Sequence, residues 1–98
     1  VICRYGGEEF GIVLPGTKSI DALRIAERIR MIIENTPLAR VKNKDVYITV
    51  SAGIASYPTD ASSVQDLVNK ADKAMIFGAK QKGRNKVVLF RPNMTAEN

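Results

Sequence analysis

The residues of this chain that could do chemistry begin with two adjacent glutamates, Glu8 and Glu9, which directly follow Gly6 and Gly7. Carboxylate oxygens are the ligands that hard divalent cations prefer, and Mg²⁺ commonly binds one or two carboxylates together with substrate phosphates. The glycines lack a Cβ atom, so a phosphate could approach the backbone closely beside them. These residue types predict a metal and nucleotide site. The alternative is a glycine turn that carries two solvated glutamates.

A second candidate group is basic and lies near the end of the chain, where Lys80 and Arg84 flank Gln81-Lys82-Gly83. Lysine binds phosphate as a point charge, and arginine can bind two phosphate oxygens at once. Basic residues at a helix end more often only complement the helix dipole. The residues alone leave both interpretations open.

Composition limits the classes of protein to consider. The chain has 98 residues and a formal charge of +5, so it is at most one small domain with a preference for anionic partners such as nucleotides. Histidine is absent, which excludes histidine catalysis and histidine metal ligands, and the single Cys3 excludes an intrachain disulfide. We find no apolar run of membrane-spanning length and no secretory signal, so we expect a cytoplasmic location.

The first elements that must position these groups are a hairpin and a helix. Val1–Tyr5 and Glu9–Leu14 are strand-like, and Gly6-Gly7 between them predicts a two-residue turn. Apolar residues then recur at helical spacing from Ser19, a candidate N-cap, to about Asn35. The apolar face of this helix is expected to contain Ala22, Ile25, Ala26, Ile29, Ile32 and Ile33. Three arginines are expected largely off that face, namely Arg24, Arg28 and Arg30.

The next predicted elements are a strand and a second helix. Asp45–Tyr57 alternates apolar and polar residues and predicts one long strand, bent or bulged near Gly53. Ser63 and Asp66 resemble a capping box at the start of a helix that runs to about Lys82. The apolar stripe of this helix is expected to contain Val64, Leu67, Val68, Ala71, Ala74, Met75 and Gly78.

The chain is predicted to end with a short strand. Gly83 suits the left-handed position after the helix, Val87–Phe90 predicts the strand, and Arg91–Asn98 reads as a polar tail. The order is hairpin, helix, strand, helix, strand. This order predicts an α/β (α+β) fold in which helices cover a mostly antiparallel or mixed sheet.

Three separated segments, "RYGGEEF", "TVSAGIASYP" and "ADKAMIFGAKQKGRNKV", together resemble the GGDEF family of diguanylate cyclases. The GGEEF form at Gly6–Phe10 is an accepted variant of the family signature. The resemblance runs in order over about residues 1–90 and implies the C-terminal part of such a domain, with the N-terminal part absent. It also implies a fold of the nucleotidyl cyclase and polymerase palm type.

The resemblance implies an enzyme that condenses two GTP molecules into cyclic di-GMP and pyrophosphate with Mg²⁺ or Mn²⁺. Two subunits of a homodimer would face each other, each holding one GTP. On this match Glu8 would ligate the metal and help activate the ribose 3′-hydroxyl, and Glu9 would assist the site. Gly6 and Gly7 would line the nucleotide.

The same match implies roles for three basic residues. Lys80 and Arg84 would hold the phosphates of the nucleotide. Arg28 would be the secondary arginine of the family's inhibitory site, which binds the product cyclic di-GMP. The aspartate of the inhibitory RxxD motif would fall immediately before Val1, so this motif is not complete here.

In the family, upstream parts of the domain supply another metal-binding aspartate and the guanine pocket. We therefore expect this chain alone to be inactive. If it folds, we expect it to associate with other copies or to exchange elements with them. One alternative is a catalytically silent module that binds GTP or cyclic di-GMP for regulation. Another is a small nucleic-acid binder, which the two glutamates disfavour because they occupy the place where phosphates would pass. We expect no direct membrane contact from this segment, although other domains could anchor the parent protein.

Overall fold

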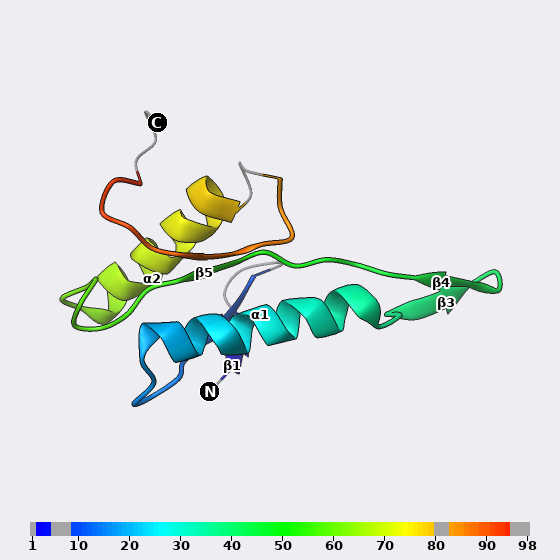
Figure 1. The fold of residues 1–98 in the computed structure, drawn as a ribbon, viewed down its shortest axis with the longest axis horizontal. Coiled ribbons are helices and arrows are strands. Elements are labelled where there is room, and N and C mark those ends of the chain that lie inside the picture. Colours follow the sequence, from blue (N-terminus) through cyan, green and yellow to red (C-terminus); the bar gives the residue numbers. More distant parts are fainter. Residues whose placement is uncertain (1, 5–8, 80–82, 95–98) are drawn as a thin grey trace.

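The computed structural model describes residues 2–4, 9–79 and 83–94. The elements in chain order are β1 (Ile2–Arg4), β2 (Phe10–Ile12), α1 (Ser19–Asn35), β3 (Ala39–Val41), β4 (Lys44–Val46), β5 (Ala52–Ile54), α2 (Val64–Lys73), the π-helix η1 (Ala74–Ala79) and β6 (Val87–Leu89). Strands β1 and β2 pair antiparallel, as do β3 and β4, whereas β5 and β6 pair in parallel. This arrangement of helices and mixed strand pairs confirms the predicted fold class (Figure 1).

Helix α1 ends at Asn35 as predicted, but its N-cap lies one residue earlier than predicted. Lys18 occupies the N-cap position and makes no side-chain capping bond, so Ser19 is the first helical residue and not the cap. The Lys18 carbonyl accepts hydrogen bonds from the amides of Asp21 and Ala22, at 3.0 and 2.9 Å. Backbone bonds therefore close the first turn without a side-chain cap.

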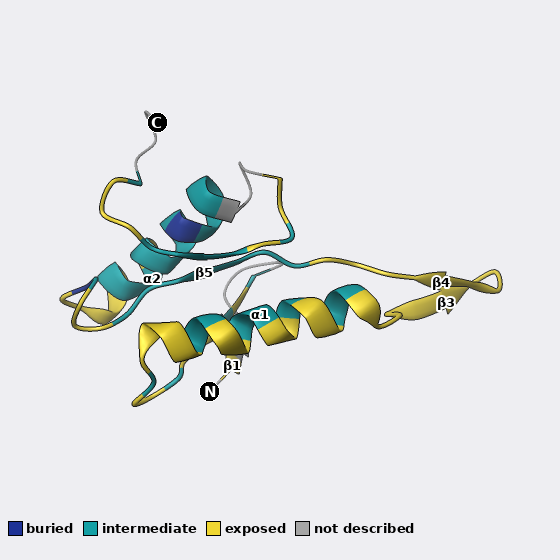
Figure 2. Cartoon of the chain, in the orientation of Figure 1, coloured by how far each residue is buried: buried dark blue, intermediate teal, exposed yellow. Residues whose placement is uncertain are grey.

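The packed face of α1 also differs from the expected one. Ile25, Ile29 and Ile32 are exposed, whereas the Arg30 side chain keeps only 14% of its surface accessible. The prediction that Arg30 lies off the packed face is therefore wrong. Its guanidinium contacts the carboxylates of Glu27 and Glu34, and paired charges can lie below the surface at a lower cost than single ones. Figure 2 shows how half-buried and exposed positions alternate along this helix.

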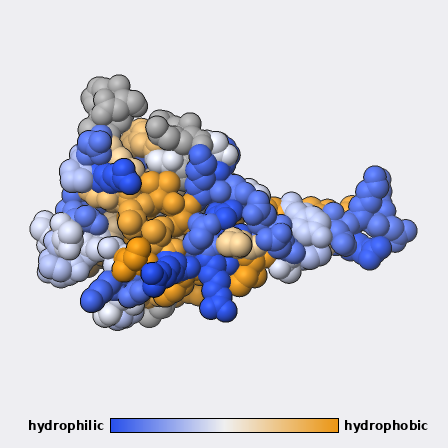
Figure 3. Space-filling view, in the orientation of Figure 1, coloured by the Kyte–Doolittle hydropathy of each residue, from blue (hydrophilic) through white to orange (hydrophobic). Residues whose placement is uncertain are grey.

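A projecting hairpin replaces the first part of the long strand predicted over 45–57. Strand β4 pairs with β3, a strand that the sequence analysis missed, and residues 47–51 then lead to β5 without strand pairing. Lys42 and Asn43 connect β3 and β4 with φ values of 50° and 65°. Two successive left-handed residues match the twist of a tight hairpin. The hairpin extends away from the rest of the molecule, and its tip is hydrophilic (Figures 1 and 3).

The most closely packed region lies where α2 and η1 cross β5. Ala74 has no accessible surface, and a Cβ on Gly53 would lie 2.0 Å from the Ala71 carbonyl oxygen and 2.4 Å from the Met75 nitrogen. Gly53 thus permits a close approach between a strand and a helix and does not mark a bulge. Val64 was expected in the apolar stripe but is 80% exposed, because it stands at the first turn of α2.

The start of α2 confirms the predicted cap, and its end shows a new feature. The Ser63 hydroxyl accepts a hydrogen bond from the Asp66 amide at 3.1 Å, while the Asp66 carboxylate accepts one from the Ser62 amide at 3.2 Å. The helix continues from Lys73 into η1, whose wider turns hold an extra residue. Among the described residues, no helix is long and apolar enough to cross a membrane.

Candidate functional site

The hairpin β1–β2 brackets the two glutamates, and its register differs from the prediction. Arg4 pairs with Phe10 and Cys3 with Gly11, so five positions, 5–9, separate the paired residues. A two-residue turn at Gly6-Gly7 would instead pair Cys3 with Phe10. The printed register thus differs from that of a regular two-residue turn, and the predicted turn residues Gly6 and Gly7 lie outside the described residues.

Of the residues predicted to act at this hairpin, Glu9 is the one that the structure describes. It is half-buried and precedes β2, so it lies outside the regular strand. The strand predicted over Glu9–Leu14 is shorter in the structure, where β2 begins at Phe10. Gly6, Gly7 and Glu8 lie outside the described residues.

A left-handed turn carries the predicted phosphate-binding arginine. Gly83, Arg84 and Asn85 have φ values of 106°, 60° and 52°, so three successive residues adopt the left-handed region. Glycine adopts it freely and asparagine tolerates it, but at Arg84 it costs on the order of 1–3 kcal/mol. The positive φ at Gly83 confirms the left-handed position predicted there. The Arg84 side chain is exposed, and Lys80 lies outside the described residues.

A polar network holds this turn against α1. The Asn85 side chain accepts a hydrogen bond from Arg30 Nη1 at 3.0 Å and donates one from Nδ2 to Glu34 Oε2 at 2.6 Å. Its backbone amide donates to the hydroxyl of Ser51 at 2.9 Å. Asn85 thus uses its amide N–H and both ends of its side chain, and the three partners come from α1 and from the residue before β5.

The charged part of this network is tightly paired. The Arg30 guanidinium donates to Glu27 Oε1 and, at 3.2 Å, to Glu34 Oε1. The hydrogen bond from Arg30 lowers the pKa of Glu27 below its ordinary value, and the same bond raises the pKa of Arg30. Both groups therefore stay charged through the neutral pH range, and the guanidinium remains a donor to Asn85.

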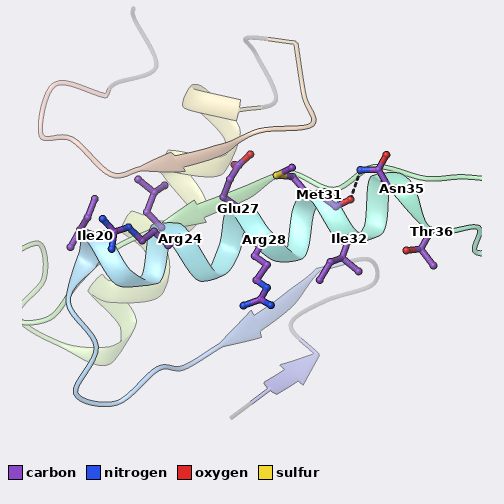
Figure 4. A pocket seen from close by; sticks show the side chains of 9 residues that line it. Ile20, Arg24, Glu27, Arg28, Met31, Ile32, Asn35 and Thr36 are labelled. Atoms are coloured by element: carbon purple, nitrogen blue, oxygen red, sulfur yellow. Dashed lines mark hydrogen bonds between the residues drawn. The ribbon is translucent and has the colours of Figure 1, made fainter.

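Arg28, the arginine that the resemblance assigned to an inhibitory site, lies on a different side of α1. It is exposed and borders an open cavity of about 850 Å³ along the helix. Figure 4 shows Arg28 and Ile32 pointing to the side opposite Glu27. The cavity is lined by Ile20, Leu23, Arg24, Glu27, Arg28, Met31, Ile32, Asn35 and Thr36. Its lining is mostly apolar and includes two arginines, Arg24 and Arg28, and one glutamate, Glu27.

Within the described ranges, no cluster of three or more acidic or cysteine side chains could hold a metal ion. Glu9 is the described carboxylate of the signature, and carboxylate oxygen is the donor that Mg²⁺ and Mn²⁺ prefer. The donor chemistry of the Glu8-Glu9 pair therefore fits a hard divalent cation. A complete ligand set requires groups beyond the described residues.

Sequence reasoning missed the network around Asn85. The spacing Glu27, Arg30, Glu34 is the i, i+3 and i, i+4 pattern of helical ion pairs, and it was available as a signal. Asn85 directly after Gly83-Arg84 was also visible as a residue that tolerates the left-handed region. The contact between Arg30 and Asn85, which lie 55 positions apart, could be found only from the folded structure.

Comparisons with known proteins give a consistent result. The family model described as "Diguanylate cyclase, GGDEF domain" matches residues 1–86. Diguanylate cyclase A of Treponema denticola is 41% identical over 91 residues, which are 93% of this chain and 24% of that protein. The response regulator PleD of Caulobacter vibrioides is 40% identical over 87 residues, 88% of this chain and 19% of that protein.

A solved structure is similar as well. It is the active GGEEF domain of a diguanylate cyclase from Vibrio cholerae, with a TM-score of 0.76 and 32% identity. The match covers 94% of this chain and 56% of that chain. The chain thus spans about a quarter or less of the curated relatives named here, and about half of the solved domain.

Proposed function

We propose, because this chain belongs to the GGDEF family of diguanylate cyclases, that it forms the C-terminal part of a domain that makes cyclic di-GMP from two GTP molecules. The observation that carries the proposal is the intact Gly-Gly-Glu-Glu-Phe signature at residues 6–10 inside a family match over residues 1–86. On this proposal, residues 1–90 belong to the cyclase domain and 91–98 to a polar tail. Residues 1–98 without the remainder of the domain are inactive.

In the proposed reaction, the 3′-oxygen of one GTP forms a bond to the α-phosphorus of the other. The bond from that phosphorus to the β-phosphate oxygen breaks, pyrophosphate leaves, and a second equivalent step closes the ring. Glu8 assists removal of the hydroxyl proton, and Glu9 supports the site. Gly6 and Gly7 leave room for the nucleotide next to the backbone.

Lys80 and Arg84 bind the phosphates in this proposal, through charge-assisted hydrogen bonds. Glu8 would hold the Mg²⁺ or Mn²⁺ ion, which when bound neutralises charge on the transferring phosphoryl group. The exposure of Arg84 at a turn of fixed backbone supports its part in binding.

In this proposal each subunit holds one GTP, so the reaction needs a homodimer. The need for GTP as substrate favours a cytoplasmic location for the domain. Arg28 contributes to inhibition by cyclic di-GMP, and its exposure beside an arginine-lined cavity supports this part of the proposal.

The test is product analysis of the full-length protein with GTP and Mg²⁺, comparing the wild type with Glu8→Gln. Asp45→Asn is the matched control, since it removes one carboxylate from the exposed hairpin strand β4. We expect cyclic di-GMP from the wild type and the control and none from Glu8→Gln. A folded wild type that binds GTP and yields no product would support the alternative, a silent module that binds nucleotide for regulation.

A further inference from the structure

We propose that Asn85 is a positioning residue, which fixes the left-handed turn at Gly83–Asn85 to α1 so that the Arg84 guanidinium is presented to nucleotide phosphate. This inference rests on the proposed function, because it concerns how that site binds its substrate. It assigns a role to Asn85, Arg30 and Glu34 in nucleotide affinity although none of them needs to touch the nucleotide.

The contacts of Asn85 are what a backbone anchor requires. Its side chain accepts from Arg30 Nη1 at 3.0 Å and donates to Glu34 Oε2 at 2.6 Å, while its own amide donates to Ser51 Oγ at 2.9 Å. These three bonds run to α1 and to Ser51, the residue before β5, so they restrain Asn85 from two sides. The anchored residue is the direct neighbour of Arg84.

The partners of Asn85 are themselves held in place. Arg30 keeps only 14% of its side chain accessible, and it bonds to Glu27 on the preceding turn of α1 and to Glu34 on the following one. On the other side, the Lys86 carbonyl accepts a hydrogen bond from the Ala52 amide at 2.9 Å, which begins the ladder between β5 and β6. The turn is thus fixed between a helix and a strand pair.

Arg84 itself gains from such an anchor. Its side chain takes no part in the network and is exposed, so only its backbone is held. A long cation that must find phosphate from a mobile backbone loses more conformational entropy on binding than one that starts from a fixed Cα. Anchoring of the turn by Asn85 therefore raises affinity for the phosphates through Arg84.

The competing interpretation is that Asn85 only ties the turn to α1 for folding. A double-mutant cycle separates the two, because coupling between residues appears as non-additive effects. We would measure binding of the GTP analogue with an α,β-methylene linkage to full-length wild type, Asn85→Gly, Arg84→Ala and the double variant. Glycine removes the side chain without adding strain at φ 52°.

If Asn85 acts through Arg84, Asn85→Gly weakens binding about tenfold in the wild-type background, which corresponds to ~1.4 kcal/mol. In the Arg84→Ala background the same change then weakens binding less than about twofold. Equal losses in both backgrounds would overturn the positioning role and leave the proposed function intact. A wild type that does not bind the analogue would overturn both. Asn43→Gly is the matched control, since Asn43 has φ 65° in the β3–β4 turn, and it should bind as wild type does.

A second set of variants tests the hydrogen bonds without removing a side chain. Asn85→Asp places a carboxylate against Glu34 Oε2, where the donor to acceptor distance is 2.6 Å, and should weaken binding. Adding Glu34→Gln restores a donor and acceptor pair in reversed order and keeps the total charge of the network. We expect this double variant to bind within about threefold of wild type, a difference of ~0.7 kcal/mol. Binding as weak as that of Asn85→Asp alone would contradict the proposal.

Discussion

Gly53→Ala should destabilise the domain strongly, because the new methyl group has no space between β5 and the helix above it. Its Cβ would lie 2.0 Å from Ala71 O, 2.4 Å from Met75 N and 3.0 Å from Met75 Cα. All three atoms belong to the backbone, so no side-chain rotation relieves the overlap. Carbon to oxygen contacts begin at ~3.3 Å, so β5 and the helix must separate by about 1.3 Å.

The expected magnitude follows from two opposing effects. Inserting a methyl group into a packed region costs about 1–3 kcal/mol, and a backbone overlap of this size lies at the upper end. The lower entropy of the unfolded alanine chain returns ~0.4–1 kcal/mol. The chain covers only 56% of the similar solved domain, so the scaling for a domain of roughly 150–250 residues applies, and a net loss of about 2 kcal/mol should lower Tm by roughly 4–8 °C.

Calorimetry of the full-length protein measures this shift in Tm. A bound GTP analogue stabilises the folded domain that binds it, so the unfolding transition whose Tm rises when the analogue is added belongs to this domain. Gly16→Ala is the matched control, since Gly16 has φ 65° and no atom within 4 Å of its Cβ position. Gly16→Ala should cost only the strain of an alanine at positive φ, ~1 kcal/mol, which lowers Tm by about 2–4 °C. A Tm for Gly53→Ala equal to or above that of Gly16→Ala would refute the packing argument.

Three further predictions concern a cap, an ion pair and the inhibitory site. Ser63→Ala removes the acceptor for the Asp66 amide and should cost ~1 kcal/mol, measured as a lower urea midpoint. The hydrogen bond from Arg30 lowers the pKa of Glu27. The contribution of Glu27 to stability is therefore present above the ordinary value of 4.5 and is lost as the pH falls through the lower pKa of the folded state. Glu27→Gln should flatten this loss of the urea midpoint in acid. Arg28→Ala should weaken inhibition by cyclic di-GMP about tenfold, measured as the concentration that halves the rate.

The first two of these predictions have control variants in the chain, and the third has an outcome that would contradict it. Ser62→Ala keeps the backbone amide that bonds to Asp66 and should leave the midpoint unchanged. Asp21→Asn removes an exposed carboxylate of α1, whose contact with Arg24 is long at 3.9 Å, and should keep the acid dependence. Unchanged inhibition in Arg28→Ala, with unchanged cyclase rate, would remove Arg28 from the inhibitory site.

The sequence predicted the elements that depend on neighbouring residues, such as helices set by apolar periodicity and capping residues. The 3.6-residue periodicity predicted the end of α1 and its start to within one residue, and the pair Ser63 and Asp66 predicted the start of α2. The turn at Lys42-Asn43 was missed because it lacks the glycine of common hairpin turns, and its two left-handed residues have no strong signal. The long strand over 45–57 was wrong because alternation continues through residues 47–51, which have no strand partner within the described chain.

For the candidate site as well, the sequence identified individual residues but not the contacts between distant parts of the chain. Residue chemistry made Glu9 and Arg84 candidates without excluding a structural role for them, and the family resemblance added Arg28. The register of β1 and β2 could not be derived from the sequence, because glycine pairs allow several connection lengths. The ion pairs of Arg30 with Glu27 and Glu34 could have been predicted from their spacing, but its contact with Asn85, 55 positions away, could not.

The parallel pairing of β5 and β6 has a consequence for the order of folding. Asn85 meets Ser51 across 34 positions and Arg30 across 55, and contacts of such separation form late because a long loop must close first. Local elements such as α1 and the β3–β4 hairpin need no such closure. The turn that carries Arg84 is therefore completed only when the last strand docks. A chain that is still emerging from the ribosome, or only partly folded, does not yet hold this arginine in its final place.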